Sequence, residues 1–300
     1  MALVENERES AKNDFTMIPY IPLEEYSKKF EQVFKFKRED GILEMRVHYK
    51  GGEQNWDVLT HDAWGKALRM VAQDRENEVL IITGTGKRWI REVTEDNEFG
   101  PYMMDNLQND HVEYCMSTYE HWYLEGRDLL RPLIYDMPIP TICALNGPSK
   151  GHTEFPLVCD ITLATPDVVF WEPHFSDLGG TVTGDGVFLV YQECFGTKLA
   201  NDMVMLGRKV SAQQAYELGA VAEICERDQI LERAWEIARF LRTRGSYNCR
   251  IQHELMVAPW RRKLAQDADF HWAAENWGTC ITDPKHVMNA VEGLMKNENV

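Results

Sequence analysis

The chain has 300 residues, of which 44% are hydrophobic and 27% charged, and its formal net charge is −16. At ~150 residues per domain, this length predicts about two domains, or one large domain with an appendage. The composition excludes collagen-like, low-complexity and wholly disordered classes. The negative charge repels a phosphate backbone or an anionic membrane surface, so we expect neither nucleic acid nor membrane as a partner.

The seven cysteines are widely scattered, and no two of them form a C-x-x-C pair. This spacing argues against a disulfide framework and a thiolate zinc site, and it indicates a reducing compartment. The first residues, MALVENERES, are charged where a secretory signal needs an apolar core. No stretch approaches the ~18 apolar residues of a membrane span. We therefore expect a soluble, cytoplasmic protein.

The chain divides into three parts by pattern. Residues 1–30 have mixed charge and weak periodicity, which indicates an extension that packs on the body or frays. An α/β core is expected over 31–240 because strand and helix patterns alternate there. Apolar residues alternate along 41–51, which predicts a strand, and a helical pattern follows over 60–77.

Two apolar runs are typical of strands buried on both faces of a parallel sheet. They are VLIITGTG at 79–86 and TICALNG at 141–147, and a helical stretch over about 108–136 separates them. The segment 160–173 then predicts strand, turn and strand. Ser211 and Gly219 are expected to cap the next helix, and a strand follows it at 221–225.

Strand signals vanish after about residue 228, which predicts a helical region over 241–300. Asp228 is expected to cap a helix over 229–244. Two further helical segments are expected, one carrying RIQHELM and one carrying ADFHWAAENW. A helical tail without its own core usually packs on a neighbouring body or subunit.

His174 and Asp185 are the first candidates for catalysis. His174 directly follows a predicted strand, and Asp185 stands between two glycines that let the backbone turn sharply. The carboxylate can then fold back to hold the imidazole, which makes a general base for water. The alternative is a solvated loop histidine and an aspartate that caps the helix beginning near Gly186.

His152 stands at the start of a short predicted helix, where the helix dipole depresses its pKa and favours the neutral form. A neutral His152 can polarise a carbonyl. The alternative is a structural histidine that bonds a neighbouring loop. His61 follows Thr60 at a helix start, and Trp56 lies upstream as a possible donor to an apolar pocket. Capping by Thr60 explains that sequence without function.

Glu275 lies four residues after His271 on a predicted helix, which by itself describes an ordinary surface pair. Burial among Trp272 and Trp277 would instead raise its pKa and let it carry a proton. No metal site is expected, because His61 and the other candidate histidines lack ligand partners at i, i+3 or i, i+4. The string GTGKRW lacks the spacing of a phosphate loop, and no serine sits in G-x-S-x-G.

From about residue 38 to 280, the order of elements and several strings resemble the crotonase (enoyl-CoA hydratase) superfamily. The strings are VLIITGTG, PTICALNG, the E-x-x-x-x-x-D of EFPLVCD, FWEPHF and TVTGDG. The resemblance implies an α/β spiral of repeated ββα turns with a C-terminal helical trimerisation region, and hence a homotrimer or a dimer of trimers. Two positions depart from the hydratases: His152 intrudes in the stretch after N-G, and His174 replaces a catalytic glutamate.

Both departures match a narrower branch, that of 6-oxocamphor hydrolase and the related β-diketone hydrolases. The sequence contains the strings of that branch, which are W-x-x-x-x-H-D, N-G-P-x-x-x-H, P-H-F and G-D-G, and a glutamate in the C-terminal helices. The residues at the matching positions are, in chain order, Trp56, His61, His152, His174, Asp185 and Glu275. The resemblance implies a hydrolase that needs no cofactor or metal and cleaves a carbon–carbon bond of a small β-diketone by a retro-Claisen reaction.

In that reaction, the resemblance implies that His174 is the base for water and Asp185 its orienting partner. His152 would stabilise the enolate or oxyanion, a contribution of ~3 kcal/mol per donor. Trp56 and His61 would line the pocket, and Glu275 would position water or assist protonation of the enolate carbon. A CoA-thioester hydratase or isomerase, and a binding protein of the same fold without activity, remain the alternatives.

Overall fold

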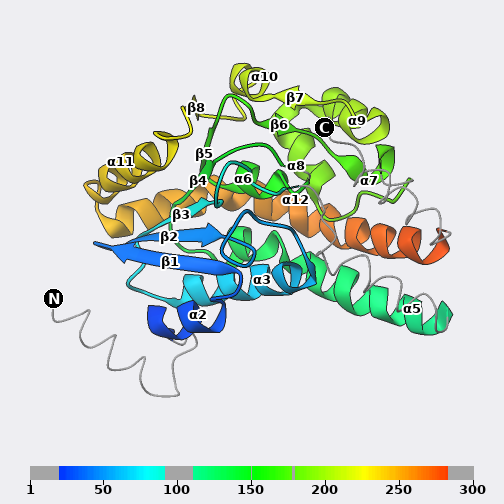
Figure 1. The fold of residues 1–300 in the computed structure, drawn as a ribbon, viewed down its shortest axis with the longest axis horizontal. Helices are drawn as coiled ribbons and strands as arrows, with labels where there is room; N and C mark the ends of the chain where they lie inside the picture. Colours follow the sequence, from blue (N-terminus) through cyan, green and yellow to red (C-terminus); the bar gives the residue numbers. More distant parts are fainter. Residues whose placement is uncertain (1–19, 92–110, 150, 178–179, 283–300) are drawn as a thin grey trace.

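The computed structural model describes residues 20–91, 111–149, 151–177 and 180–282 (Figure 1). A six-stranded sheet lies at its centre. In spatial order the strands are β1 (Phe34–Glu39), β2 (Ile42–Val47), β3 (Val79–Thr83), β4 (Thr141–Leu145), β5 (Ile161–Ala164) and β8 (Glu223–Ile224). The first two form an antiparallel hairpin, and the others run parallel to their neighbours. A separate antiparallel pair consists of β6 (Val169–Phe170) and β7 (Val210–Ser211).

Helices cover both faces of this sheet (Figure 1). The longer ones are α3 (Val58–Gln73), α8 (Val187–Phe195), α9 (Thr197–Leu206), α11 (Ile230–Arg242) and α12 (Ser246–Ile281). The shorter ones are α2 (Leu23–Lys29), α5 (His111–Thr118), α6 (Glu154–Val158), α7 (Pro173–Ser176) and α10 (Ala212–Glu217). After α5 the chain continues in π-helical and 3₁₀ turns, η1 (Tyr119–Glu125), η2 (Gly126–Asp128) and η3 (Pro132–Asp136). The start of the helix predicted over 108–136 lies outside the described residues.

The central strands are buried on both faces, as their apolar runs predict. Leu80 and Ile82 of β3 face the main core, whereas Val79 and Ile81 face a smaller apolar cluster under α11. The burial of every residue of β3 and β4 follows from this two-sided cover.

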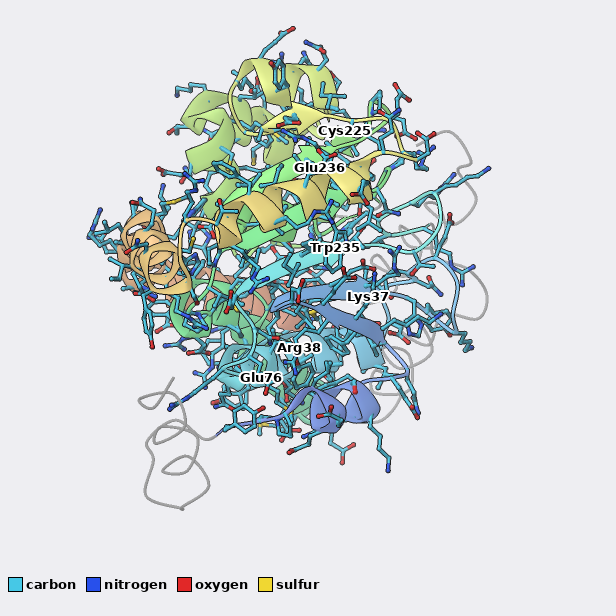
Figure 2. The ribbon with its side chains drawn as sticks, turned by 90° about the vertical axis from the view of Figure 1, so that its left-hand side faces the viewer. Lys37, Arg38, Glu76, Cys225, Trp235 and Glu236 are labelled. Atoms are coloured by element: carbon cyan, nitrogen blue, oxygen red, sulfur yellow. The ribbon has the colours of Figure 1, made fainter. Side chains whose placement is uncertain are left out.

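The strand β2 is also covered on both sides, although its alternating sequence predicts one polar face. Trp235 of α11 packs over that face, and its indole N–H donates to Glu44 at 2.9 Å. Figure 2 shows Lys37 beside Trp235, with the ammonium 4.8 Å from the indole centroid. The buried glutamate thus has a hydrogen-bond partner, which a buried polar group requires.

Two predicted helix boundaries are wrong, and a third is confirmed. The cap of α3 is Asp57, whose carboxylate accepts from the Thr60 N–H at 2.8 Å, so Thr60 is inside the helix. The residue before α11 is Gln229 instead of Asp228, and it makes no side-chain cap bond. Ser211 caps α10 as predicted, with a reciprocal bond to Gln214.

The two C-terminal helical segments are one helix, α12, with Pro259 inside it. Contacts with η3 hold the chain helical close to this proline. The Arg261 guanidinium donates to the Ile134 carbonyl at 2.8 Å, and the Tyr135 hydroxyl donates to the Arg261 carbonyl at 2.8 Å. Tertiary packing here outweighs the low helix propensity of proline.

The described part of the predicted N-terminal extension packs on the body. Tyr26 of α2 is fully buried, and its hydroxyl donates to Asp74 at 3.0 Å. At the other end, Trp272 of α12 belongs to the main core, so the C-terminal helix shares it. Residues 1–19 and 283–300 of the two predicted terminal regions lie outside the described residues. None of the helices described here is long and apolar enough to cross a membrane.

Candidate active site

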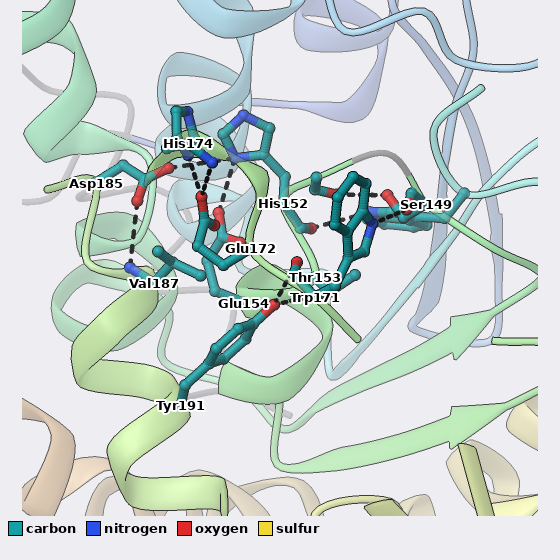
Figure 3. Close-up of polar contacts among 12 residues, drawn as sticks. Ser149, His152, Thr153, Glu154, Trp171, Glu172, His174, Asp185, Val187 and Tyr191 are labelled. Carbon is teal, nitrogen blue, oxygen red and sulfur yellow. Dashed lines mark hydrogen bonds and ion pairs between the residues drawn. The ribbon is translucent and has the colours of Figure 1, made fainter. Parts of the chain in front are cut away.

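Four segments that are far apart in the sequence meet at one end of the sheet. His152 lies two residues before the start of α6, His174 lies in α7, Asp185 lies in the loop before α8, and Glu275 is carried by α12. The two imidazole rings are 6.4 Å apart between centroids, and His152 Nδ1 is 3.7 Å from Asp185 Oδ2 (Figure 3). The structure therefore brings the main predicted residues into one cluster.

The carboxylate that bonds His174 is Glu172, where the sequence predicts Asp185. Glu172 is the N-cap of α7: its Oε1 accepts from the His174 backbone N–H at 2.7 Å and also bonds His174 Nδ1. Asp185 instead accepts from the Val187 N–H at 3.4 Å and turns its other oxygen toward His152. Sequence spacing favoured Asp185 because flanking glycines make its loop adaptable, but a carboxylate two residues from the histidine reaches it without a turn.

His152 has its own glutamate. Its Nδ1 lies 2.8 Å from Glu154 Oε1, and Glu154 is fully buried with its second oxygen lacking a hydrogen-bond partner in the described chain. The His152 backbone has a φ of 52°, a left-handed conformation that is uncommon for a residue with a side chain and recurs at functional sites. Packing over-determines this conformation, since the ring stacks on Phe155 at 5.3 Å and lies 4.1 Å from Trp56 between centroids.

Burial favours the neutral form of both members of this pair. Burial lowers the pKa of His152 to about 4, although the Asp185 charge opposes the shift. Burial raises the pKa of Glu154 well above its usual range, and Asp185 raises it further. The sequence predicts the direction for His152 from the helix dipole, but burial is the larger cause. In the protonated form Glu154 would donate to Nδ1, and the ring proton of His152 would then sit on Nε2, from which it can be donated onward.

His174 has the opposite shift. Burial lowers its pKa, but the negative charges of Glu172 and Asp185, together with Glu275, outweigh burial and raise the pKa well above 6.5. Burial also raises the pKa of Asp185, an effect that the His174 charge opposes. Two imidazoles with pKa values shifted in opposite directions are typical of a site that separates a proton donor from a base.

Glu275 reaches the cluster because α12 passes directly over the loop before α8. A methyl group on Gly184 would stand 2.2 Å from the His271 carbonyl oxygen and 2.4 Å from Glu275 Cβ, so only glycine fits there. Glu275 is buried, and burial raises its pKa well above its usual range, with Asp185 adding to the shift. The alternative of an exposed surface pair is therefore wrong for Glu275.

Trp56 lies against His152, and His61 is one layer further out. The His61 ring contacts Trp56 with centroids 6.3 Å apart, whereas the described ring contacts of His152 are with Trp56, Phe155 and His174. His61 is buried at the first turn of α3. The structure thus brings Trp56 to the cluster directly and His61 through Trp56.

Sequence reasoning missed Glu154 and Glu172. Glu172 carried a signal, since it precedes Pro173 at the first position of a helix and a carboxylate there can cap the helix. Tyr191 of α8 was also missed: its hydroxyl donates to the Trp171 carbonyl at 3.0 Å and bonds the Thr153 hydroxyl. These bonds fix the segment that follows His152 and the segment that precedes His174 (Figure 3).

One group of side chains has the composition of a metal site. Ligand atoms of His152, Glu154 and Asp185 lie within 4.8 Å of one another, a set that suits zinc or a similar divalent ion. The sequence did not predict this group, because its members are spaced two and thirty-one residues apart. In the structure the imidazole nitrogen of the group is hydrogen-bonded to Glu154.

Comparison with known proteins identifies the class. Residues 105–290 match the family described as Enoyl-CoA hydratase/isomerase. A match over more than half of the chain, together with the parallel sheet and the C-terminal helix, shows a crotonase fold. The chain belongs to the enoyl-CoA hydratase/isomerase family of the crotonase superfamily, and the predicted fold class is confirmed.

Three known proteins illustrate what the chain is similar to. It is 25% identical over 208 residues to the mitochondrial enoyl-CoA hydratase of Pongo abelii, which covers 68% of the chain and 65% of that relative. It is also 31% identical to ABDH, a beta-diketone hydrolase from the cyanobacterium Anabaena sp. PCC 7120. That structural match covers 85% of this chain and 97% of ABDH, with a TM-score of 0.74. The crystal structure of an enoyl-CoA hydratase/isomerase from Mycobacterium paratuberculosis is 18% identical, and the match covers 87% of this chain and 98% of that one, with a TM-score of 0.74. At this identity the likeness shows the fold alone.

Proposed function

We propose that the protein is a cofactor-independent hydrolase that cleaves the carbon–carbon bond between the two carbonyls of a β-diketone. The observation that carries this proposal is the pair of facing histidines with opposite pKa shifts, each bonded to its own glutamate. The 31% identity to a beta-diketone hydrolase supports it.

The first step is the attack of water on one carbonyl. His174 in its neutral form accepts a proton from water at Nε2, because its Nδ1 is bonded to Glu172. The oxygen of water bonds to the carbonyl carbon, and the carbonyl electron pair moves to oxygen. The imidazolium that forms is stabilised by the carboxylates of Glu172 and Asp185.

The second step breaks the carbon–carbon bond. The electron pair of that bond moves to the neighbouring carbon and is delocalised onto the second carbonyl as an enolate. His152 faces His174 and donates from Nε2 to the enolate oxygen, a role that a neutral imidazole performs without a proton being lost. Protonation of the enolate carbon then gives one ketone and one carboxylic acid. Together these two products contain all the atoms of the diketone and the water.

Glu275 supplies or relays the last proton. Its raised pKa favours the protonated acid, and it lies close enough to His174 and Asp185 to interact with both charges. Trp56 and Phe155 stack beside His152 and form an apolar wall for the carbon skeleton of the substrate. His61 supports Trp56 in this arrangement.

Assembly as a homotrimer or a dimer of trimers belongs to the same proposal, as does a cytoplasmic location. The side chains of Tyr247, Ile251 and Leu255 project from the first turns of α12 and are more than 60% exposed. A row of apolar side chains on one helix is typical of an interface. Light scattering coupled to gel filtration measures the assembly, and a monomer would contradict this part of the proposal.

The test is a screen of cyclic and acyclic β-diketones followed by loss of enol absorbance. Crotonyl-CoA is assayed in parallel for hydration of its double bond. The proposal expects cleavage of at least one diketone, with the ketone and acid products identified by mass spectrometry, and no hydration of crotonyl-CoA. Hydration without cleavage would place the protein with the CoA-dependent hydratases. Binding of a diketone without turnover would make it a binding protein.

We expect the pH profile of kcat/KM for diketone cleavage to have an acid limb above pH 6.5. The base must be neutral, and the charges of Glu172 and Asp185 raise the pKa of His174 above 6.5, so activity is lost as pH falls through that raised value. His152, with a pKa of about 4, stays neutral over the same range and adds no ionisation there. An acid limb at or below pH 6 would contradict the assignment of His174 as the base.

A further inference from the structure

We propose that Glu172 is the positioning residue of His174: it fixes the proton on Nδ1 and aims Nε2 at the substrate water. This inference rests on the proposed hydrolase function and adds a residue that the sequence did not single out. It also assigns Asp185 to a different place, beside His152. The two assignments predict different responses to substitution.

Geometry favours Glu172 over Asp185. The same Glu172 oxygen accepts from the His174 backbone N–H at 2.7 Å and bonds its Nδ1, so one atom fixes both the main chain and the ring. The Glu172 side chain is 1% exposed, which leaves it no solvent-facing rotamer. Among the described residues, the polar contacts of the Asp185 carboxylate are with Val187 N–H and His152 Nδ1.

The bond to Glu172 decides which ring nitrogen is available. A carboxylate accepts only, so Nδ1 carries a proton and Nε2 keeps its lone pair when the ring is neutral. The N-cap position makes the arrangement stiff, because moving Glu172 also removes the partner of an orphan helix N–H. Preorganisation of this kind places the base before the substrate arrives.

Several titratable groups face His174 from the packed elements, so the effect of Glu172 must be tested against theirs. They are Asp185 from the loop before α8, Glu275 from α12, and His152 and Glu154 from the start of α6. Glu172 differs from all of them in its direct hydrogen bond to His174, because it is the one described partner of His174 Nδ1.

The experiment compares Glu172→Gln with Asp185→Asn, which each replace one buried carboxylate by its amide. The glutamine oxygen can still accept from the backbone and from Nδ1, so the fold is kept while the charge is removed. Ring-¹⁵N NMR of histidine-labelled protein follows the titration of His174, and the His174→Gln spectrum assigns its signal. We expect Glu172→Gln to lower the pKa of His174 by roughly 1–3 pH units and Asp185→Asn to lower it less.

A third variant separates positioning from charge. Glu172→Ala removes the acceptor, so neutral His174 should lose its Nδ1-protonated tautomer in the ¹⁵N spectrum, whereas Glu172→Gln and Asp185→Asn should keep it. For diketone cleavage we expect kcat to fall about 10²-fold or more in Glu172→Ala, with partial recovery in Glu172→Gln and KM changed little. Thermal unfolding checks that each variant is folded.

The inference is overturned if Asp185→Asn shifts the His174 titration more than Glu172→Gln does, or if the tautomer is unchanged in Glu172→Ala. The NMR titration uses no substrate, so its result stands apart from the diketone screen. A wild-type protein that cleaves no diketone would end the proposed function, while the titration would still decide which carboxylate holds His174.

Discussion

We expect His174→Ala to lower kcat for diketone cleavage about 10²- to 10⁴-fold while the protein stays folded. The variant removes the base, but the side chain is 19% exposed and lies at the edge of the core, so its loss leaves a water-accessible space and not a sealed cavity. The measurement is steady-state kinetics above the acid limb, with Tm recorded for both proteins.

His253→Asn is the matched control for His174→Ala. His253 is a fully packed histidine of α12 whose Nδ1 bonds Asp160 at 2.7 Å and whose Nε2 bonds the Met137 carbonyl at 3.0 Å, away from the site. Its replacement should lower Tm because buried partners lose their bonds, and it should leave kcat of the folded protein near the wild-type value. Equal losses of kcat in the two variants would mean that His174 acts through stability.

The strands could be predicted because their pattern records burial directly. The apolar runs of β3 and β4 indicate cover on both faces, and the structure has that cover. Helix ends were harder to predict because competing cap residues stand within one helical turn of each other. Asp57 and Thr60 both suit an N-cap, and the choice depends on where the chain enters α3.

The cluster of the site could be predicted only as far as a resemblance carries residue positions. His152 and His174 lie on separate loops, and nothing in their spacing shows that their rings meet. The partner of each ring depended on side-chain directions: Glu154 and Glu172 each lie two residues from the histidine that they bond. Such short-range pairs have weak sequence signals, because a carboxylate near a histidine is usually solvated.

The close approach of α12 to the loop before α8 leads to a second strong expectation. We expect Gly184→Ala to lower kcat for diketone cleavage about 10²-fold and to lower Tm by several degrees. The added methyl group would lie 2.2 Å from the His271 carbonyl oxygen and 2.4 Å from Glu275 Cβ, both within α12, so the helix or the loop must move. Overpacking of this kind costs roughly 1–3 kcal/mol.

The loss of activity follows from what the two moving parts carry. The loop holds Asp185 next to Gly184, and α12 holds Glu275, so a shift of either changes distances inside the cluster. A displacement of about 1 Å at a catalytic group can cost ~10²-fold in rate. Gly52→Ala is the control, because its nearest neighbour would be the Tyr49 carbonyl oxygen at 3.7 Å, and it should change neither kcat nor Tm. If Gly184→Ala kept wild-type kinetics, Glu275 and Asp185 would not need their present positions, and their roles in the reaction would have to be abandoned.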